Sequence, residues 1–231
     1  MNNKNIFTIT LYLSIFIQIT SGVVDLIALL TKIDSSYNII KQLLFLEFIV
    51  QIIEGIFYMW LFFNLYKVTN VTPNRYIDWA ITTPTMLIQL IMYLIYLSYK
   101  EKNMETSTLD FITLLLENSR VITYVLFLNW LMLLFGYLGE MKYFSTTTTV
   151  FLGFIPFFIY YIIIYINYAV NSNLGRTVFW YFFIIWSLYG IAALLPYYIK
   201  NAFYNILDLF SKNFFGLYFS YMILTNKYTK L

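Results

Sequence analysis

Seven stretches of this chain are apolar and long enough to cross a lipid bilayer. A helix needs roughly 20 such residues to span the hydrocarbon layer. The stretches lie at about 6–31, 38–65, 74–99, 121–139, 147–170, 176–197 and 201–225. We therefore predict an all-α, multi-pass integral membrane protein, a bundle of seven transmembrane helices that forms a single domain over residues 1–231.

The composition agrees with a membrane protein and argues against several kinds of chemistry. Hydrophobic residues make up 61% of the chain and charged residues 11%, with a mean hydropathy of +0.73. A soluble domain is nearer half apolar and a quarter charged. Cysteine and histidine are absent, so we expect neither an enzyme nor a metal site. The net charge of +3 is spread over the loops and indicates no nucleic-acid surface.

Two further segments need an assignment. The first apolar stretch is too long for a signal peptide and follows only the weakly basic Asn2-Asn3-Lys4, so we expect a retained first helix. Residues 107–118, between the third and fourth stretches, are apolar but bounded by charges. They predict a short helix that lies at the membrane surface.

The basic residues in the connections predict the orientation, because cytoplasmic loops are enriched in Lys and Arg. One side collects Lys32, Lys41, Lys100, Lys102, Arg120, Arg176, Lys227 and Lys230. The other side has Lys4, Lys67, Lys142 and Lys200, with Arg75 just inside the third stretch. We expect the C-terminus in the cytoplasm and the N-terminus outside.

Lys212 lies in the middle of the last apolar stretch. A lysine at that depth must be paired, deprotonated or chemically modified. Asp208 is four residues earlier, on the same face of a helix, and can answer a positive charge there. A bare structural ion pair satisfies this pattern, and so does a positively charged Schiff base on Lys212.

The start of the third stretch supplies a second acid. The run Arg75-Tyr76-Ile77-Asp78-Trp79-Ala80-Ile81-Thr82-Thr83-Pro84 places Arg75, Asp78 and Thr82 within two helical turns. Asp78 and Asp208, with Arg75 nearby, make a plausible counterion cluster for one buried cation. Such a cluster is costly in a membrane unless a positive charge lies between the acids.

These two patterns, R-Y-x-D-W-x-x-T-T-P and D-x-x-x-K, together resemble the microbial (type 1) rhodopsins. The sequence Trp186-Ser187-Leu188-Tyr189 in the sixth stretch matches the W-x-x-Y of that family. The resemblance covers all seven stretches. It implies all-trans retinal, covalently bound to Lys212 as a protonated Schiff base, with Asp78 and Asp208 as counterions.

The resemblance also implies roles for the residues around the chromophore. Thr82 should hydrogen-bond Asp78, Tyr189 should touch Asp208, and Trp79 and Trp186 should sandwich the polyene. The rest of the pocket should include Thr83, Met86, Asn129, Met132 and Gly136. Gly190 and Ala193 stand where the family has a proline and an aromatic residue, which leaves the ring end of the pocket open. Without the resemblance, aromatic residues at helical spacing would be read as packing.

Gln89 bears on the type of rhodopsin. In the proton pumps of this family, the position eleven residues after the acceptor carries a carboxylate that returns a proton to the Schiff base. Asp78 plus eleven is Gln89, which cannot donate a proton at neutral pH. The acid at Asp78 in turn argues against a chloride pump and against the sodium-pump pattern.

The second stretch carries a polar stripe, with Glu47, Gln51, Glu54 and Tyr58 at spacings of four, three and four. Such a stripe points to a bundle interior or a water path. Protonated glutamates that only hydrogen-bond within the bundle are the alternative reading.

Channelrhodopsins have a similar stripe and a similar S-K-N in the last helix. That likeness makes Glu54 the glutamate of a central gate and Asn213 its partner. Asn205, seven residues before Lys212, extends the predicted ion path through Arg75, Glu47, Gln51, Glu54, Tyr58 and Asn213.

Three further patterns look like the viral rhodopsins of giant algal viruses, particularly their group 1. They are the T-S-G-x-x-D of Thr20 to Asp25, the two glutamates of the second stretch, and Gly136-Tyr137-Leu138-Gly139-Glu140. This likeness implies a light-gated channel for monovalent cations in a host-cell membrane. An outward proton pump and a photosensor that signals through a partner are the alternatives. Homo-oligomers are common among related proteins.

Overall fold

The computed structural model describes residues 2–226, and all its regular elements are helices. They are α1 (Asn3–Leu30), η1 (Ser35–Tyr37), α2 (Asn38–Asn64), α3 (Thr72–Glu101), α4 (Phe111–Glu117), α5 (Ser119–Glu140), α6 (Thr146–Asn167), η2 (Ala169–Asn171), α7 (Asn173–Ala192), α8 (Tyr197–Asp208), η3 (Leu209–Asn213) and α9 (Phe214–Thr225). The predicted all-α membrane fold is confirmed. Lys227 and Lys230, which we counted for the orientation, lie outside the described residues.

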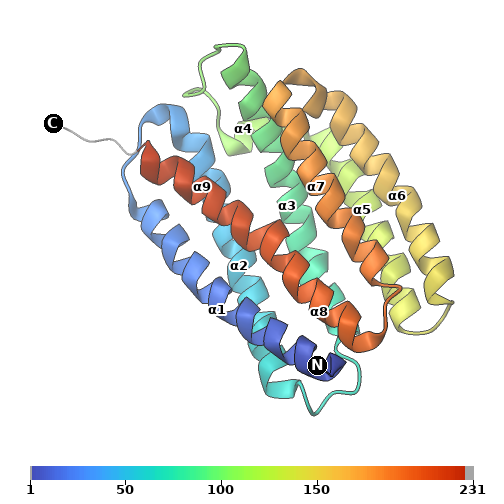
Figure 1. Ribbon diagram of the computed structural model, residues 1–231. Coiled ribbons are helices and arrows are strands. Elements are labelled where there is room, and N and C mark those ends of the chain that lie inside the picture. The colour runs from blue at the N-terminus through green and yellow to red at the C-terminus, as the bar shows by residue number, and fades with distance from the viewer. Residues whose placement is uncertain (1, 227–231) are drawn as a thin grey trace.

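The bundle has seven passes, formed by α1, α2, α3, α5, α6, α7 and the run from α8 to α9 (Figure 1). Six of the described helices are by themselves long and apolar enough to cross a membrane. The last pass reaches that length only as α8, η3 and α9 together, because η3 is a π-helical turn between two α-helices. That turn contains Lys212. π-turns within helices are frequent at functional sites.

The boundary between the last two passes differs from the prediction. The sixth stretch was predicted to end at residue 197 and the seventh to begin at 201, whereas α7 ends at Ala192 and α8 begins at Tyr197. Pro196 explains the difference. It disfavours helical geometry at Leu195, and its own extended ψ of 146° makes it the N-cap of α8.

The predicted surface helix is present but shorter than 107–118. Asp110 begins it, because its side chain accepts hydrogen bonds from the backbone N–H groups of Ile112 and Thr113, both at 3.1 Å. Gln42 of α2 donates a hydrogen bond to the same carboxylate at 3.0 Å. These bonds, that from Gln42 above all, hold the pKa of Asp110 below its ordinary value. The hydrogen bond from Gln42 thereby connects the start of α4 to the N-terminal part of α2.

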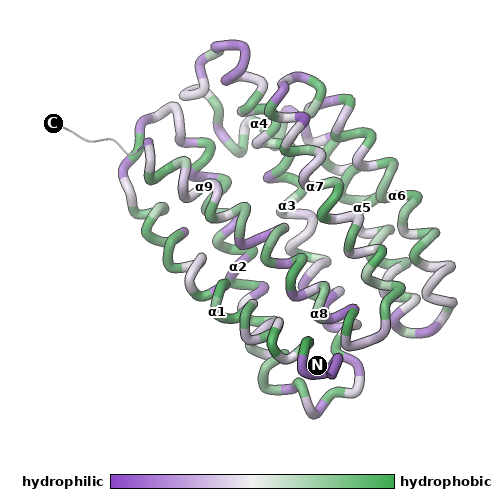
Figure 2. Tube along the Cα trace, in the orientation of Figure 1, coloured by the Kyte–Doolittle hydropathy of each residue, from purple (hydrophilic) through white to green (hydrophobic). Residues whose placement is uncertain are grey.

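Apolar side chains face outward along the middle of the passes. Phe16, Ile56 and Phe151 are 68%, 67% and 70% exposed. Hydrophilic segments gather in the connections at the two ends of the bundle (Figure 2). This distribution fits a lipid environment for the bundle wall.

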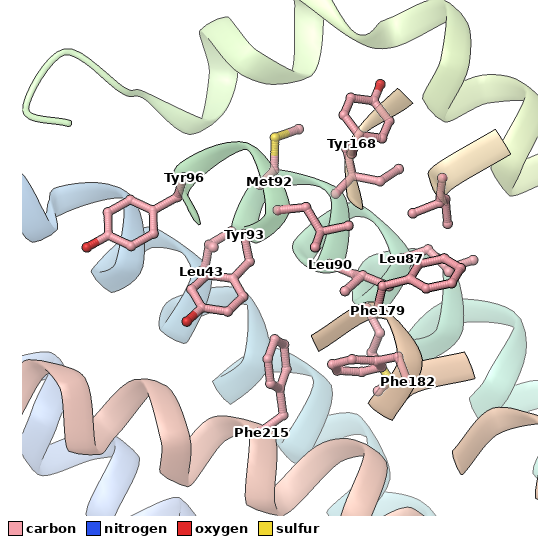
Figure 3. Packing of buried hydrophobic residues seen from close by; sticks show 14 of the residues in the cluster. Leu43, Leu87, Leu90, Met92, Tyr93, Tyr96, Tyr168, Phe179, Phe182 and Phe215 are labelled. Carbon is pink, nitrogen blue, oxygen red and sulfur yellow. The ribbon is translucent and has the colours of Figure 1, made fainter. Parts of the chain in front are cut away.

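A core of large apolar side chains fills the end of the bundle nearest α4 (Figure 3). Leu90 and Tyr93 of α3 meet Phe182 of α7 and Phe215 of α9 there. The rings of Phe182 and Phe215 pack edge to face, 4.7 Å apart. This core joins the two sides of the bundle beyond Lys212.

Pro84 interrupts the hydrogen-bond ladder of α3, because it has no N–H to donate to the carbonyl of Ala80. The indole N–H of Trp130 on α5 donates to that carbonyl instead, at 2.9 Å. One residue earlier, the Asn129 amide donates to the Thr83 hydroxyl at 2.8 Å. Helix α5 therefore holds α3 at its proline.

Candidate functional site

Lys212 is 1% exposed and is surrounded by carboxylates from three helices. Its Nζ lies 3.1 Å from Oδ2 of Asp78 on α3 and 3.7 Å from Oδ1 of Asp208 on α8. Glu54 of α2, which the sequence assigned only to the ion path, comes within 3.6 Å. A positive charge on Lys212 is therefore compensated on three sides.

Asp208 contacts three further groups. The hydroxyls of Tyr189 and Tyr58 donate to its two oxygens at 2.7 Å and 2.8 Å. Arg75 forms a buried ion pair with it at 3.3 Å and also donates to Asn205 and, at 3.1 Å, to Asn201. The predicted contact between Tyr189 and Asp208 is thus present.

Asp78 has fewer hydrogen-bond and ion-pair partners than Asp208. Its Oδ2 accepts from Lys212, while Oδ1 has no hydrogen-bond partner within residues 2–226. The predicted hydrogen bond from Thr82 to this carboxylate is wrong. The Thr82 hydroxyl donates instead to the main-chain oxygen of Asp78 at 3.0 Å, a common geometry for a threonine inside a helix. Asp78 therefore keeps one oxygen free to accept a proton.

A cavity of about 780 Å³, counting its open mouth, begins at Lys212 and extends between α3, α5, α6 and α7. The predicted pocket residues that line it are Trp79, Thr83, Met86, Met132, Gly136, Trp186 and Tyr189. Asn129 does not line it. The sequence missed the contribution of α6, in particular Gly153, Phe154 and Phe157, because no motif marks them. An apolar cavity with one lysine fits a long polyene joined to that lysine.

The two departures from the family pattern both line this cavity. A Cβ at Gly190 would lie 2.6 Å from the ring of Phe154. Phe154 therefore takes up the space that the missing side chain leaves. Gly136 likewise leaves space for Tyr76, because a Cβ added at Gly136 would lie 2.6 Å from the Tyr76 hydroxyl.

A second polar stripe, on α1, faces the predicted stripe on α2. Together with the last pass they form what we name the polar seam: Ser14, Gln18, Ser21, Asp25, Glu47, Gln51, Glu54, Tyr58, Asn205, Asp208, Lys212, Asn213 and Ser220, none more than 7% exposed. The α1 members recur every three or four residues. The spacing rule that found the stripe on α2 would have found this one.

Glu54 and Asn213, the residues of the expected gate, both have hydrogen-bond partners on α1. The Asn213 amide donates to Ser21 at 3.0 Å, and Glu54 accepts from Gln18 at 2.9 Å. Among the described residues there is no hydrogen bond between Glu54 and Asn213, and their pairing at a central gate stays a prediction. Asn213 lies in η3, which packs against α1 as well as α2.

Lys200 does not lie in a connection, as the orientation count assumed. It belongs to α8, and its Nζ pairs with Oε1 of Glu140 on α5 at 2.6 Å. The six described basic residues of the other group still share one end of the bundle with α4.

Comparison with known proteins now assigns the family. Residues 6–226 match the family model described as bacteriorhodopsin-like protein, and the chain belongs to that family. No curated protein sequence matches.

Among solved structures, the viral rhodopsin OLPVRII is 28% identical, with a TM-score of 0.77 over 95% of this chain and 98% of that chain. The blue light-absorbing proteorhodopsin from Med12 is 20% identical, with a TM-score of 0.73 over 97% and 99% of the two chains. The bromide-bound halorhodopsin of Halobacterium salinarum is 14% identical, with a TM-score of 0.72 over 97% and 96%.

These findings confirm a microbial rhodopsin with a likeness to a viral one; the finer placement in group 1 stays a prediction. The last two likenesses show the fold alone. Rhodopsins of this family bind retinal through a Schiff base on a lysine, and they act as light-driven transporters or sensors.

Proposed function

We propose that this protein is a light-gated channel for monovalent cations, with all-trans retinal attached to Lys212. The observation that carries the proposal is the polar seam, a buried path of carboxyl, amide and hydroxyl groups beside Lys212. Acidic and amide oxygens are suitable ligands for cations inside a membrane. Polar groups buried within a membrane-spanning bundle are costly, and they commonly mark the path of an ion or substrate.

Lys212 is the residue that would hold retinal, because the cavity begins at its side chain. When bound, retinal supplies light absorption and isomerisation. Asp78 and Asp208 would serve as the counterions. Asp78, with its free oxygen, is placed to accept a proton from the Lys212 nitrogen, whereas Asp208 is occupied by Tyr58, Tyr189 and Arg75.

Gln89 argues for a channel over the alternative of an outward proton pump. It is fully buried, and its amide donates to the backbone oxygen of Leu43 at 3.0 Å. An amide at this place cannot reload the Schiff base. The cation path would instead run along Glu54, Gln51 and Glu47. No described contact favours a sensor that signals through a partner.

The setting follows from the same features. The basic residues near α4 support a cytoplasmic location for that end of the bundle. The partners are then the lipid bilayer, retinal and monovalent cations or protons. A host-cell membrane and a homo-oligomer remain predictions from the family resemblance.

Purified protein in liposomes separates channel from pump. Without any ion gradient, we expect illumination to move no net charge, whereas a preset sodium gradient should dissipate faster in light than in darkness. The same liposomes without retinal are the control. Light-driven acidification against the starting gradient would establish a pump and contradict the proposal.

A further inference from the structure

Three helices of the polar seam meet at Gly216, one helical turn after Lys212. A Cβ at this glycine would lie 2.5 Å from Oδ2 of Asp25 and 2.6 Å from the amide nitrogen of Gln51. It would also lie 3.2 Å from Cγ of Glu47. A larger residue at this position would have to displace these side chains, so α1 and α2 bring two acidic side chains against the backbone of α9.

Asp25 is the better satisfied of the two acids. Its Oδ1 accepts a hydrogen bond from the Ser220 hydroxyl at 2.5 Å, and its Oδ2 accepts one from the Gln51 amide. Both oxygens of Asp25 therefore have a hydrogen-bond partner.

Glu47 has the opposite surroundings. It is fully buried, yet neither carboxyl oxygen has a hydrogen-bond partner in the described chain. The amide oxygen of Gln89, whose side chain lies beside Glu47, also has none. Gln89 binds the backbone of Leu43, one turn before Glu47 on α2. Buried polar atoms normally have partners, so this group of oxygens points to a positively charged ligand.

The balance of buried charge supports the same conclusion. Three of the described basic residues are buried, and one of them, Lys200, pairs with Glu140. That leaves Arg75 and Lys212 to balance the buried acids of the described chain, which are Asp25, Glu47, Glu54, Asp78 and Asp208. The ion pairs of Arg75 and Lys212 reach Asp208, Asp78 and Glu54. No ion pair of the described residues reaches Asp25 or Glu47.

We infer that Asp25 and Glu47, with the side-chain oxygens around them, form a binding site for one sodium-sized monovalent cation, distinct from the carboxylates at Lys212. A proton on Glu47 could satisfy one neighbouring oxygen, whereas a cation can be shared by several. This inference rests on the proposed channel function and names a site within its path.

The position of Gly216 gives the site a connection to light. Lys212 and Gly216 lie on the same face of the last pass, and Asn213 directly follows Lys212. A displacement of η3 therefore moves the backbone that closes the site. In this structure all the side chains of the site are buried, so a cation can exchange only when α9 separates from α1 or α2.

The test uses Asp25→Asn and Glu47→Gln in the full, retinal-loaded protein. Both variants keep the side-chain shape, and neither acid is an ion-pair partner of Lys212, so we expect unchanged pigment colour. Under illumination we expect sodium photocurrents to fall about tenfold or more in each variant. Asp34→Asn, on the exposed connection before α2, is the matched control and should conduct like the wild type.

A second measurement does not depend on conduction. Thermal unfolding in darkness is compared in sodium chloride and in N-methyl-D-glucamine chloride at equal ionic strength. We expect sodium to stabilise the wild type and the control, but neither Asp25→Asn nor Glu47→Gln.

The outcomes separate the site from the channel. A wild type without photocurrent, but with stabilisation by sodium that needs both acids, would refute the proposed function and support the site. Normal sodium currents in both variants, currents carried by protons alone, or stability that ignores sodium in the wild type would each overturn the site.

Discussion

The two sides of the bundle around Lys212 differ in the chemistry of their side chains. Towards α5, α6 and α7 the surroundings are aromatic and apolar, with Trp186, Phe154 and Phe157 along one cavity. Towards α1, α2 and α9 they are hydroxyls, amides and carboxyls, among which both oxygens of Glu47 have no hydrogen-bond partner in the described chain. The apolar side can hold a ligand by shape and dispersion. The polar side is costly in lipid and needs a function to account for it.

Lys212 belongs to both sides, since it lines the cavity and pairs with Glu54 of the polar seam. We therefore expect substitutions in the cavity to change colour more than current, and substitutions in the polar seam to do the reverse. Those at Lys212 and its counterions should affect both.

Lys212→Ala should have the largest effect, a complete loss of colour after retinal is added, because no nitrogen remains for the linkage. Absorption spectroscopy of the purified protein measures this. Lys142→Ala, at an exposed residue beyond α5, is the control and should be coloured. A pigmented Lys212→Ala protein would place the linkage elsewhere.

Asp78→Asn should shift the absorption maximum to longer wavelength, on the order of tens of nanometres, because the nearest negative charge to the Lys212 nitrogen is lost. Asp25→Asn removes a buried acid that has no contact with Lys212 and should leave the spectrum unchanged. If the two variants have the same spectrum as the wild type, Asp78 is not a counterion.

Glu54→Ala should form pigment with a smaller spectral shift than Asp78→Asn, because Glu54 is farther from Lys212, at 3.6 Å against 3.1 Å. Its photocurrent should change strongly in size or kinetics, since Glu54 links Gln18 to Lys212 within the polar seam. Glu54→Gln, which keeps the shape, separates charge from packing. An unchanged photocurrent in both variants would remove Glu54 from the path.

Gly190→Ala should have the smallest effect, because it only crowds the cavity. The added methyl group would meet Phe154, and overpacking of this kind costs about 1–3 kcal/mol. We expect slower pigment formation and a slightly lower melting temperature, with conduction per pigment retained. Phe154→Leu in the same chain should restore the rate. Normal pigment with altered ion selectivity in this variant would contradict the expectation that substitutions in the cavity affect colour more than current.

The sequence predicted the seven passes well because lipid leaves few alternatives to long apolar helices. It could not place the turn between α7 and α8, where Pro196 decides the boundary. The spacing of Asp208 and Lys212 predicted that these two residues lie close together, whereas the approach of Asp78 to Lys212 was implied by the family resemblance. The stripe on α1 was missed because Ser14, Gln18 and Ser21 are small or neutral and attract less notice than glutamates.

Contacts that depend on tertiary packing lay beyond the sequence. Lys212 and Asn213, which contact Glu54 and Ser21, both lie in a π-turn that no residue pattern predicts. The crowding of Phe154 against Gly190 likewise needs the relative placement of α6 and α7.

The reversal potential of the photocurrent tests the central claim, that the polar seam conducts cations in light. Patch-clamp recordings of illuminated wild type are made at two sodium gradients that differ tenfold. A sodium-selective path predicts a shift of about 59 mV between them. A current that keeps its direction at every voltage, whatever the gradient, would contradict the account.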